Sequence, residues 1–99
     1  MSDDYKGMAI GILEADGYLA CFMALDAAAK AANVQIQNLE RNRLAAGACM
    51  KMRGSISDVT AAMEVAVRTA EQYGKVTSHT VMASPSVDSE KAFYMTTND

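Results

Sequence analysis

The order of secondary-structure patterns most limits the folds available to this chain. Short runs of apolar and β-branched residues alternate with longer stretches in which apolar residues recur at helical spacing. The sequence predicts these elements in order: strand 5–14, helix 18–33, strand 34–39, strand 48–52, a helix between the capping residues 55–58 and Gly74, and strand 75–83. This β-α-β-β-α-β order predicts an α+β domain, a variant of the ferredoxin-like fold. Its sheet is mostly antiparallel, with both helices packed on one face.

The ends of the two predicted helices carry residues suited to stopping them. Asp16 and Gly17 supply a cap and a turn before the first helix, and Gly74 closes the second helix as a C′ residue would. The first helix is rich in alanine, and the larger apolar residues share one of its faces: Leu19, Phe22, Met23 and Ala27. The second helix has a core-facing stripe: Val59, Ala62, Met63, Ala66, Val67 and Ala70.

The chain length and the net charge limit the classes of protein to which this chain can belong. The 99 residues predict one domain, 1–99, with a core at about 5–83 and a tail at 84–99 that holds one short helix. A net charge of −3 argues against a nucleic-acid partner, which needs a basic patch. No apolar run reaches the roughly 20 residues that span a bilayer, and the N-terminus lacks a secretory pattern. We therefore expect a cytoplasmic protein with no membrane contact.

The sequence lacks a recognisable catalytic constellation. His79 is the single histidine and falls within a predicted strand, where a structural role is expected. Cys21 and Cys49 lie far apart, match no metal spacing and sit among apolar neighbours, which predicts buried, reduced thiols. No phosphate-binding glycine loop is present either. The sequence therefore predicts neither an enzyme nor a site for a cofactor or metal.

Four colinear segments carry a family resemblance: AIGILE at 9–14, Gly17, LDAAAKAANV at 25–34, and Met52-Arg53-Gly54. Together they resemble the single-domain, hexamer-forming shell proteins of bacterial microcompartments (BMC domain) from about residue 8 to residue 91. The resemblance implies a homohexameric tile that packs edge to edge with itself and with other shell proteins. It also implies a central pore for small polar metabolites, enclosed enzymes as possible partners, and location in the microcompartment shell.

The resemblance assigns tile-edge contacts to Lys30, Asn33 and Ser84. In the family a lysine at the position of Lys30 meets its symmetry mate, whereas the residues alone also allow Lys30 to pair with Asp26 on a solvated helix face. Ser84 stands where family members often carry an arginine that inserts into the adjacent tile. A single hydroxyl replaces five donors there, which implies weaker or differently shaped contacts between tiles.

The resemblance also places the loop after the second strand at the central pore, with these pore-lining residues: Asn42, Arg43, Leu44, Ala45 and Ala46. The loop lacks the usual glycine-serine-glycine segment and is one residue longer. If Arg43 faces the axis, a ring of guanidinium groups favours anions. If Leu44 or Ala45 faces it, the constriction is apolar or lined by backbone amides.

Three further residues receive structural roles. Arg41 is expected to point from the strand to a subunit interface, and Arg53 with Gly54 to anchor a subunit contact or a carbonyl. A different class of function also fits the element order, namely a small-ligand-sensing regulatory domain. That alternative needs a pocket at a sheet edge or an interface, and oligomeric state separates it from the tile.

Overall fold

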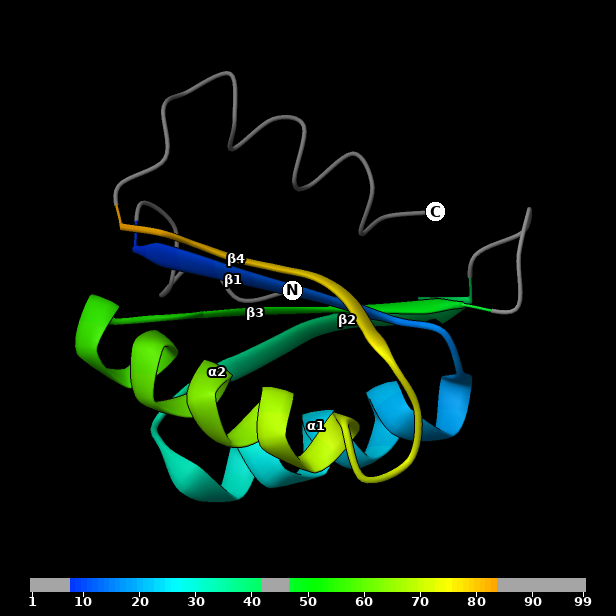
Figure 1. Ribbon diagram of the computed structural model, residues 1–99. Helices are drawn as coiled ribbons and strands as arrows, with labels where there is room; N and C mark the ends of the chain where they lie inside the picture. Colours follow the sequence, from blue (N-terminus) through cyan, green and yellow to red (C-terminus); the bar gives the residue numbers. More distant parts are fainter. Residues whose placement is uncertain (1–7, 42–46, 84–99) are drawn as a thin grey trace.

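The computed structural model of the protein describes residues 8–41 and 47–83 (Figure 1). Its elements, in chain order, are β1 (Ala9–Ala15), α1 (Tyr18–Ala31), β2 (Gln35–Arg41), β3 (Ala48–Gly54), α2 (Ile56–Ala70) and β4 (Val76–Met82). The predicted order of strands and helices is therefore confirmed. The predicted helical tail within 84–99 lies outside the described residues, as do residues 5–7 of the predicted core and first strand.

The four strands form one antiparallel sheet in the order β2-β3-β1-β4. Strands β1 and β3 are central, so β2 and β4 form the two edges. Both helices cover the same face of the sheet (Figure 1), with α1 packed mainly beneath β2 and β3 and α2 mainly beneath β1 and β4. The two edges of the molecule therefore differ, because each edge strand is backed by a different helix.

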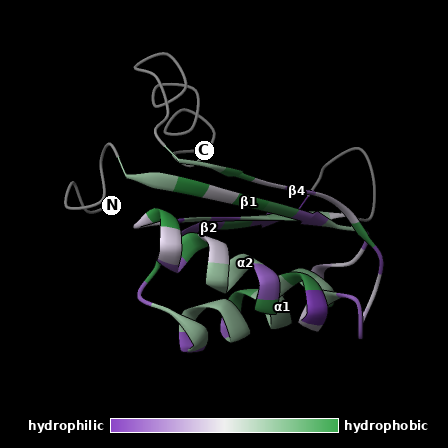
Figure 2. Ribbon diagram, turned by 60° about the vertical axis from the view of Figure 1, so that its left-hand side comes forward, coloured by the Kyte–Doolittle hydropathy of each residue, from purple (hydrophilic) through white to green (hydrophobic). Residues whose placement is uncertain are grey.

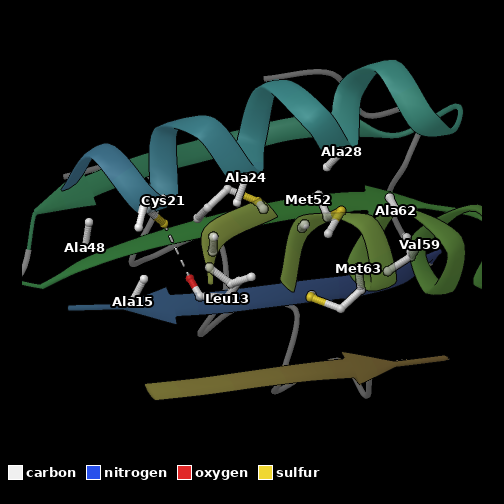
Figure 3. Close-up of a cluster of buried hydrophobic side chains, with 14 of the residues drawn as sticks. Leu13, Ala15, Cys21, Ala24, Ala28, Ala48, Met52, Val59, Ala62 and Met63 are labelled. Atoms are coloured by element: carbon white, nitrogen blue, oxygen red, sulfur yellow. Dashed lines mark hydrogen bonds between the residues drawn. The ribbon is translucent and has the colours of Figure 1, made fainter. Parts of the chain in front are cut away.

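The two helices pack together through alanines. The buried residues of α1 are Ala20, Cys21, Ala24 and Ala28. The buried residues of α2 are Val59, Ala62, Met63, Ala66 and Ala70. Each helix thus buries three alanines spaced four residues apart, a ridge that lets two helices and the sheet approach closely (Figure 3). The predicted core stripe of α2 is confirmed, with Val67 partly buried against the cluster.

The first helix buries a different face from the one that carries its larger apolar residues. Leu19 is 57% exposed and Phe22 is 46% exposed, whereas Ala20, Ala24 and Ala28 are fully buried. A large side chain cannot fit where α1 lies against α2, because the alanine ridges leave room for little more than a methyl group. The size of the apolar side chains alone therefore does not identify the buried face of this helix.

Strand β1 runs through the centre of the sheet and is mostly hydrophobic along its length (Figure 2). Its first residues are buried on both faces as predicted, but Glu14 near its end is exposed. Gly11 faces α2, where an added Cβ would lie 2.9 Å from Cγ1 of Val59 and 3.1 Å from Cγ of Met52. The missing side chain therefore lets α2 sit close to the central strand.

Strand β2 departs from simple alternation. Ile36 pairs with Met52 and Leu39 with Met50, so the pairing shifts by one residue between Ile36 and Asn38. The extra residue lets Ile36 and Leu39, three apart in sequence, both pack against the core. The strand also runs to Arg41, two residues beyond its predicted end.

The ends of the helices only partly follow the prediction. Ser55 caps α2 as expected, because its hydroxyl accepts a hydrogen bond from the Asp58 amide at 3.1 Å. Asp16 does not cap α1; the N-cap is Gly17, without a side-chain bond. Instead the Lys75 amide donates to Oδ1 of Asp16 at 2.7 Å, and the Asp16 amide donates to the Lys75 carbonyl at 2.9 Å. Asp16 thereby ties the start of α1 to the connection before β4.

Gly74 does not end α2, which stops at Ala70 with Glu71 as its C-cap. An added Cβ at Gly74 would lie 2.8 Å from Oδ1 of Asp16 and 3.2 Å from Cβ of Ala20. The glycine is therefore needed for the close approach of this connection to α1.

Replacing Gly11 by alanine tests the contact between β1 and α2. We expect Gly11→Ala to lower the free energy of unfolding by about 1–3 kcal/mol, because the new methyl group overpacks the core. Removing the nearest atoms with Val59→Ala should reduce that cost, so the double variant should be more stable than the sum of the single effects allows. Urea denaturation of the four proteins measures this coupling. Strictly additive losses would contradict the contact.

Candidate functional site

Lys30 lies in the last turn of α1 and is exposed, with 76% of its side chain accessible. Its Nζ donates to Oδ2 of Asp26 at 2.9 Å, one helical turn earlier. The intrachain pairing that the residues allow is thus present. An exposed pair of this kind contributes little to stability, commonly about 0.3–0.5 kcal/mol, so it does not restrain Lys30 strongly. The ammonium group remains accessible to a second chain.

Asn33 and Gly54, both singled out in the sequence, lie side by side. A Cβ added at Gly54 would lie 3.1 Å from the backbone oxygen of Asn33 and 3.3 Å from Cγ1 of Val34. The end of β3 therefore packs directly beneath the chain that leads from α1 into β2. Asn33 itself is exposed, two residues beyond the end of α1. Lys30 and Asn33 thus share one end of the molecule with Gly54.

Arg53 is fully buried, and its Nη2 donates to the Met8 carbonyl at 2.8 Å. Its neighbours along β3, Met52 and Met50, belong to the core cluster on the helix side. Because side chains alternate along a strand, Arg53 and Lys51 lie on the opposite face of the sheet. Lys51 is only 6% exposed and pairs with Glu40 at 3.9 Å. The sequence did not indicate this buried cation, since Lys51 stands in an otherwise apolar strand.

The antiparallel β2–β3 hairpin holds the predicted pore loop. Arg41 pairs with Ala48 at its last described rung, so residues 42–46 connect the two strands there. Those five predicted pore residues lie outside the described residues, and so does Ser84. Their roles stay predictions.

Arg41 stacks on an aromatic side chain of its own subunit. Its guanidinium carbon lies 4.5 Å from the centre of the Tyr18 ring, at the start of α1. The Tyr18 ring in turn stacks on Phe22, with ring centres 6.5 Å apart. The sequence missed this cluster, although a tyrosine, a leucine and a phenylalanine within five residues of an alanine-rich helix were the available signal. We name Tyr18, Leu19, Phe22 and Arg41 the aromatic patch.

A shallow groove lies between α2 and β4, with a volume of about 530 Å³. Its lining residues are Thr60, Met63, Glu64, Val67, Arg68, His79 and Val81. The lining is mainly apolar, with Glu64 and Arg68 exposed along its helix side. We name it the α2–β4 groove. His79 reaches it because it pairs across the sheet with Leu13, whose side chain faces the helices.

Both cysteines are free thiols, and burial raises their pKa values. Cys21 is fully buried and donates a weak hydrogen bond from Sγ to the Leu13 carbonyl at 3.8 Å (Figure 3). Burial, then the nearby Cys49 and Glu14, raise the pKa of Cys21 from 9.0 to about 12. Cys49 is half-buried, and burial is also the main cause that raises its pKa to about 11. Neutral thiols of this kind are poor nucleophiles and metal ligands.

Among residues 8–41 and 47–83, no three acidic, histidine or cysteine side chains gather as a metal site would require. Within the same residues, no helix has both the length and the apolar character needed to cross a bilayer. The features described above lie at the surface of the described residues: an exposed lysine, an aromatic patch and an apolar groove.

Comparison with known proteins gives consistent matches. Residues 9–85 match the BMC domain family. The carboxysome shell protein CcmK3 of Halothece sp. is 31% identical over 80 residues, which cover 79% of this chain and 78% of that protein. The carboxysome assembly protein CcmO of Synechococcus elongatus is 35% identical over 78 residues, covering 78% of this chain. The chain spans only 28% of the length of CcmO.

A solved structure shares the fold. The crystal structure of a microcompartment protein from Desulfitobacterium hafniense superposes with a TM-score of 0.78 over 85% of this chain and 47% of that one. The two sequences are 21% identical, so this likeness concerns the arrangement of strands and helices.

The raised pKa of Cys21 predicts a pH dependence of stability. Above pH 9 the unfolded thiol loses its proton while the folded thiol keeps it, so this group favours folding below pH 9 and progressively less above it. Cys21→Ala removes that dependence. The fall in unfolding free energy from pH 8 to pH 10 should then be smaller than in the wild type by about 1.4 kcal/mol. Urea denaturation under reducing conditions measures it, and an unchanged slope would contradict the burial of the thiol.

Proposed function

The chain belongs to the BMC domain family, and we propose that it builds the wall of a bacterial microcompartment as a homohexameric tile. Tiles would pack edge to edge with copies of themselves and with other shell proteins. In this proposal the protein is structural rather than catalytic, resides in the cytoplasmic shell and controls the passage of small polar metabolites. Enzymes enclosed by the shell are further candidate partners.

The observation that best supports this proposal is that the two predicted contact regions lie at opposite ends of α1. Tyr18, at the first residue of α1, touches Arg41 at the hairpin end of β2. Lys30 lies at the other end of the helix, which at 1.5 Å per residue spans about 20 Å. If the hairpin points to the centre of a ring, Lys30 and Asn33 point to its rim. A single orientation of the subunit in the ring would therefore put the predicted pore loop at the centre and the predicted edge residues at the rim.

The rim contact would use the long stem of Lys30. Its methylene groups can lie on a neighbouring tile while the ammonium group donates to carbonyl oxygens across a two-fold axis. Asn33 supplies amide groups beside it. Ser84 contributes one hydroxyl where relatives often use arginine, so this tile is proposed to bind its neighbours more weakly or to depend on other shell proteins.

The pore would be lined by residues 42–46. Symmetry repeats every charge around the axis, so Arg43 at the narrowest point produces a positive constriction that favours anions. If Leu44 or Ala45 faces the axis instead, the constriction is apolar or lined by backbone amides. Asn42 and Ala46 flank these positions. Arg53 and Gly54 are proposed to hold the end of β3 in place near a subunit contact.

A small-ligand-sensing domain is the second candidate. The α2–β4 groove favours it, because it lies at a sheet edge and offers about 530 Å³ of partly apolar space. Such a domain would be a dimer or trimer and would melt at higher temperature with its ligand. The tile and the sensor therefore differ in subunit number.

Native mass spectrometry of the purified protein at low micromolar concentration separates these candidates. We expect a species of hexamer mass, since a tile must close a ring before it can tessellate. A dimer or trimer as the largest species would contradict the tile and direct attention to ligand screening.

Substitution of Lys30 tests the rim contact. Lys30→Ala should abolish extended sheets in electron micrographs and leave the hexamer intact in solution. Asp26→Asn should leave the sheets intact, because it removes the intrachain partner but not the ammonium group. Lys75→Ala, which removes another exposed lysine, is the matched control. Sheets that persist in Lys30→Ala would rule out the rim role.

Charge reversal at residue 43 tests the pore. Arg43→Glu should shift ion selectivity of hexamers in a planar bilayer from anions towards cations, seen as a reversal potential of opposite sign under a salt gradient. The hexamer mass should not change. Arg43→Lys keeps the positive charge at the same position and should preserve the wild-type selectivity. Equal selectivity of Arg43→Glu and the wild type would exclude Arg43 from the constriction.

A further inference from the structure

Four strand ends and the start of α1 gather at one end of the molecule. There β1 ends and β4 begins, because Ala15 pairs with Val76, and β2 ends where β3 begins, because Arg41 pairs with Ala48. Ala15 also pairs with Ala48, which joins these two pairs of strand ends. Segment 42–46 leaves and returns at this end, so the contacts that fix Arg41 and Ala48 also fix the attachment of the proposed pore loop.

The two attachment points are supported unequally. Ala48 is 2% exposed and lies on β3, which has a paired strand on each side. Arg41 is exposed and lies on edge strand β2, whose backbone pairs only with β3. The position of Arg41 therefore depends more strongly on the contacts of its side chain.

The last two side chains of β2 are held on opposite faces of the sheet. Glu40 approaches Lys51 at 3.9 Å on the face away from the helices. Arg41 turns to the helix side, where its guanidinium carbon lies 4.5 Å from the centre of the Tyr18 ring. Within residues 8–41 and 47–83, Arg41 forms no ion pair. Its side chain is therefore oriented by the stack on Tyr18 rather than by a carboxylate.

Tyr18 is a firm support, because the start of α1 is itself fixed. The Tyr18 ring stacks on Phe22 one helical turn later, with ring centres 6.5 Å apart and planes inclined by 22°. Just before the helix, Asp16 exchanges two hydrogen bonds with the backbone of Lys75. The alanine ridge then holds α1 against α2. The stack thus connects the end of an edge strand to the packed body of the molecule.

We propose that Tyr18 is a positioning residue for the pore loop. Through its stack on Arg41 it fixes the point at which segment 42–46 leaves β2, and with it the place of the constriction. The inference rests on the proposed function, because only the hexamer turns this segment into a pore. Symmetry repeats any displacement of the segment in every subunit, so loss of the stack changes the opening on all sides of the axis at once.

Substitutions that keep all charges provide the test. Tyr18→Leu removes the ring but keeps apolar bulk, and it leaves Arg41 and Arg43 in place. Tyr18→Phe keeps the ring face and should behave like the wild type. Tyr73→Leu makes the same change at a 47% exposed tyrosine that, among the described residues, joins no ring stack. Tyr18 is 38% exposed, so the fold and the hexamer mass should persist in all three variants.

Hydrogen exchange of the backbone amides at the hairpin end of β2 measures the stack directly. We expect about 2- to 5-fold faster exchange there in Tyr18→Leu, which corresponds to the loss of about 0.5–1 kcal/mol for an exposed cation–π contact. Tyr18→Phe and Tyr73→Leu should exchange at the wild-type rate. Equal rates in Tyr18→Leu and the wild type would overturn the inference.

A double variant ties the effect to Arg41. Arg41→Met keeps a long side chain without the cation and should also accelerate exchange. If both changes act by breaking one stack, Tyr18→Leu with Arg41→Met should exchange no faster than the faster single variant. Independent, multiplying effects would show that Tyr18 does not act through Arg41.

The pore itself supplies the second readout. In planar bilayers, Tyr18→Leu hexamers should differ from the wild type in conductance and ion selectivity although no charge has changed, whereas Tyr18→Phe should restore both. Faster exchange without any change in the pore would show that the stack holds β2 but does not position the constriction, and would overturn the inference while leaving the tile standing. A wild type that forms no hexamer would instead overturn the proposed function itself.

Discussion

The close contact between α1 and α2 beneath the sheet is the constraint on which the rest of the structure depends. Alanine ridges on both helices let them approach each other, and Gly11 lets α2 approach the central strand. This packing leaves no room for the larger residues of α1. Leu19 and Phe22 are therefore displaced to the surface. The tight packing of the helices and the exposure of these two apolar residues are thus two consequences of the same small side chains.

The sheet carries its charges on the face away from the helices. Arg53 and Lys51 are both buried there, and Glu40 and the Met8 carbonyl supply partners for them. Cations buried in this way are costly unless paired, so they fix the strand positions more specifically than apolar residues would. Glu40 connects Lys51 to β2, and the Met8 carbonyl connects Arg53 to the chain that enters β1.

The parts of the fold that sequence reasoning predicted are those with a local cause. Strand and helix order followed from periodicity, and the Ser55 cap followed from its position before an apolar stripe. The parts that it missed depend on contacts distant in sequence. Asp16 binds the backbone of Lys75, and Gly74 makes room for Asp16 and Ala20. Neither contact can be predicted from the neighbouring residues in the sequence, which by themselves indicate local capping roles for Asp16 and Gly74.

The sequence by itself determined the β-α-β-β-α-β order and the family resemblance, and it singled out Lys30 and Asn33, both of which are exposed. These features depend on residue types and on short spacings, which can be identified directly in the sequence. Only the tertiary structure decided which face of α1 is buried, how Arg41 meets Tyr18, and that a patch and a groove lie on opposite edges. The reason is physical: which surface of a helix enters the core depends on the space its partners leave, and that space exists only after the elements have packed together.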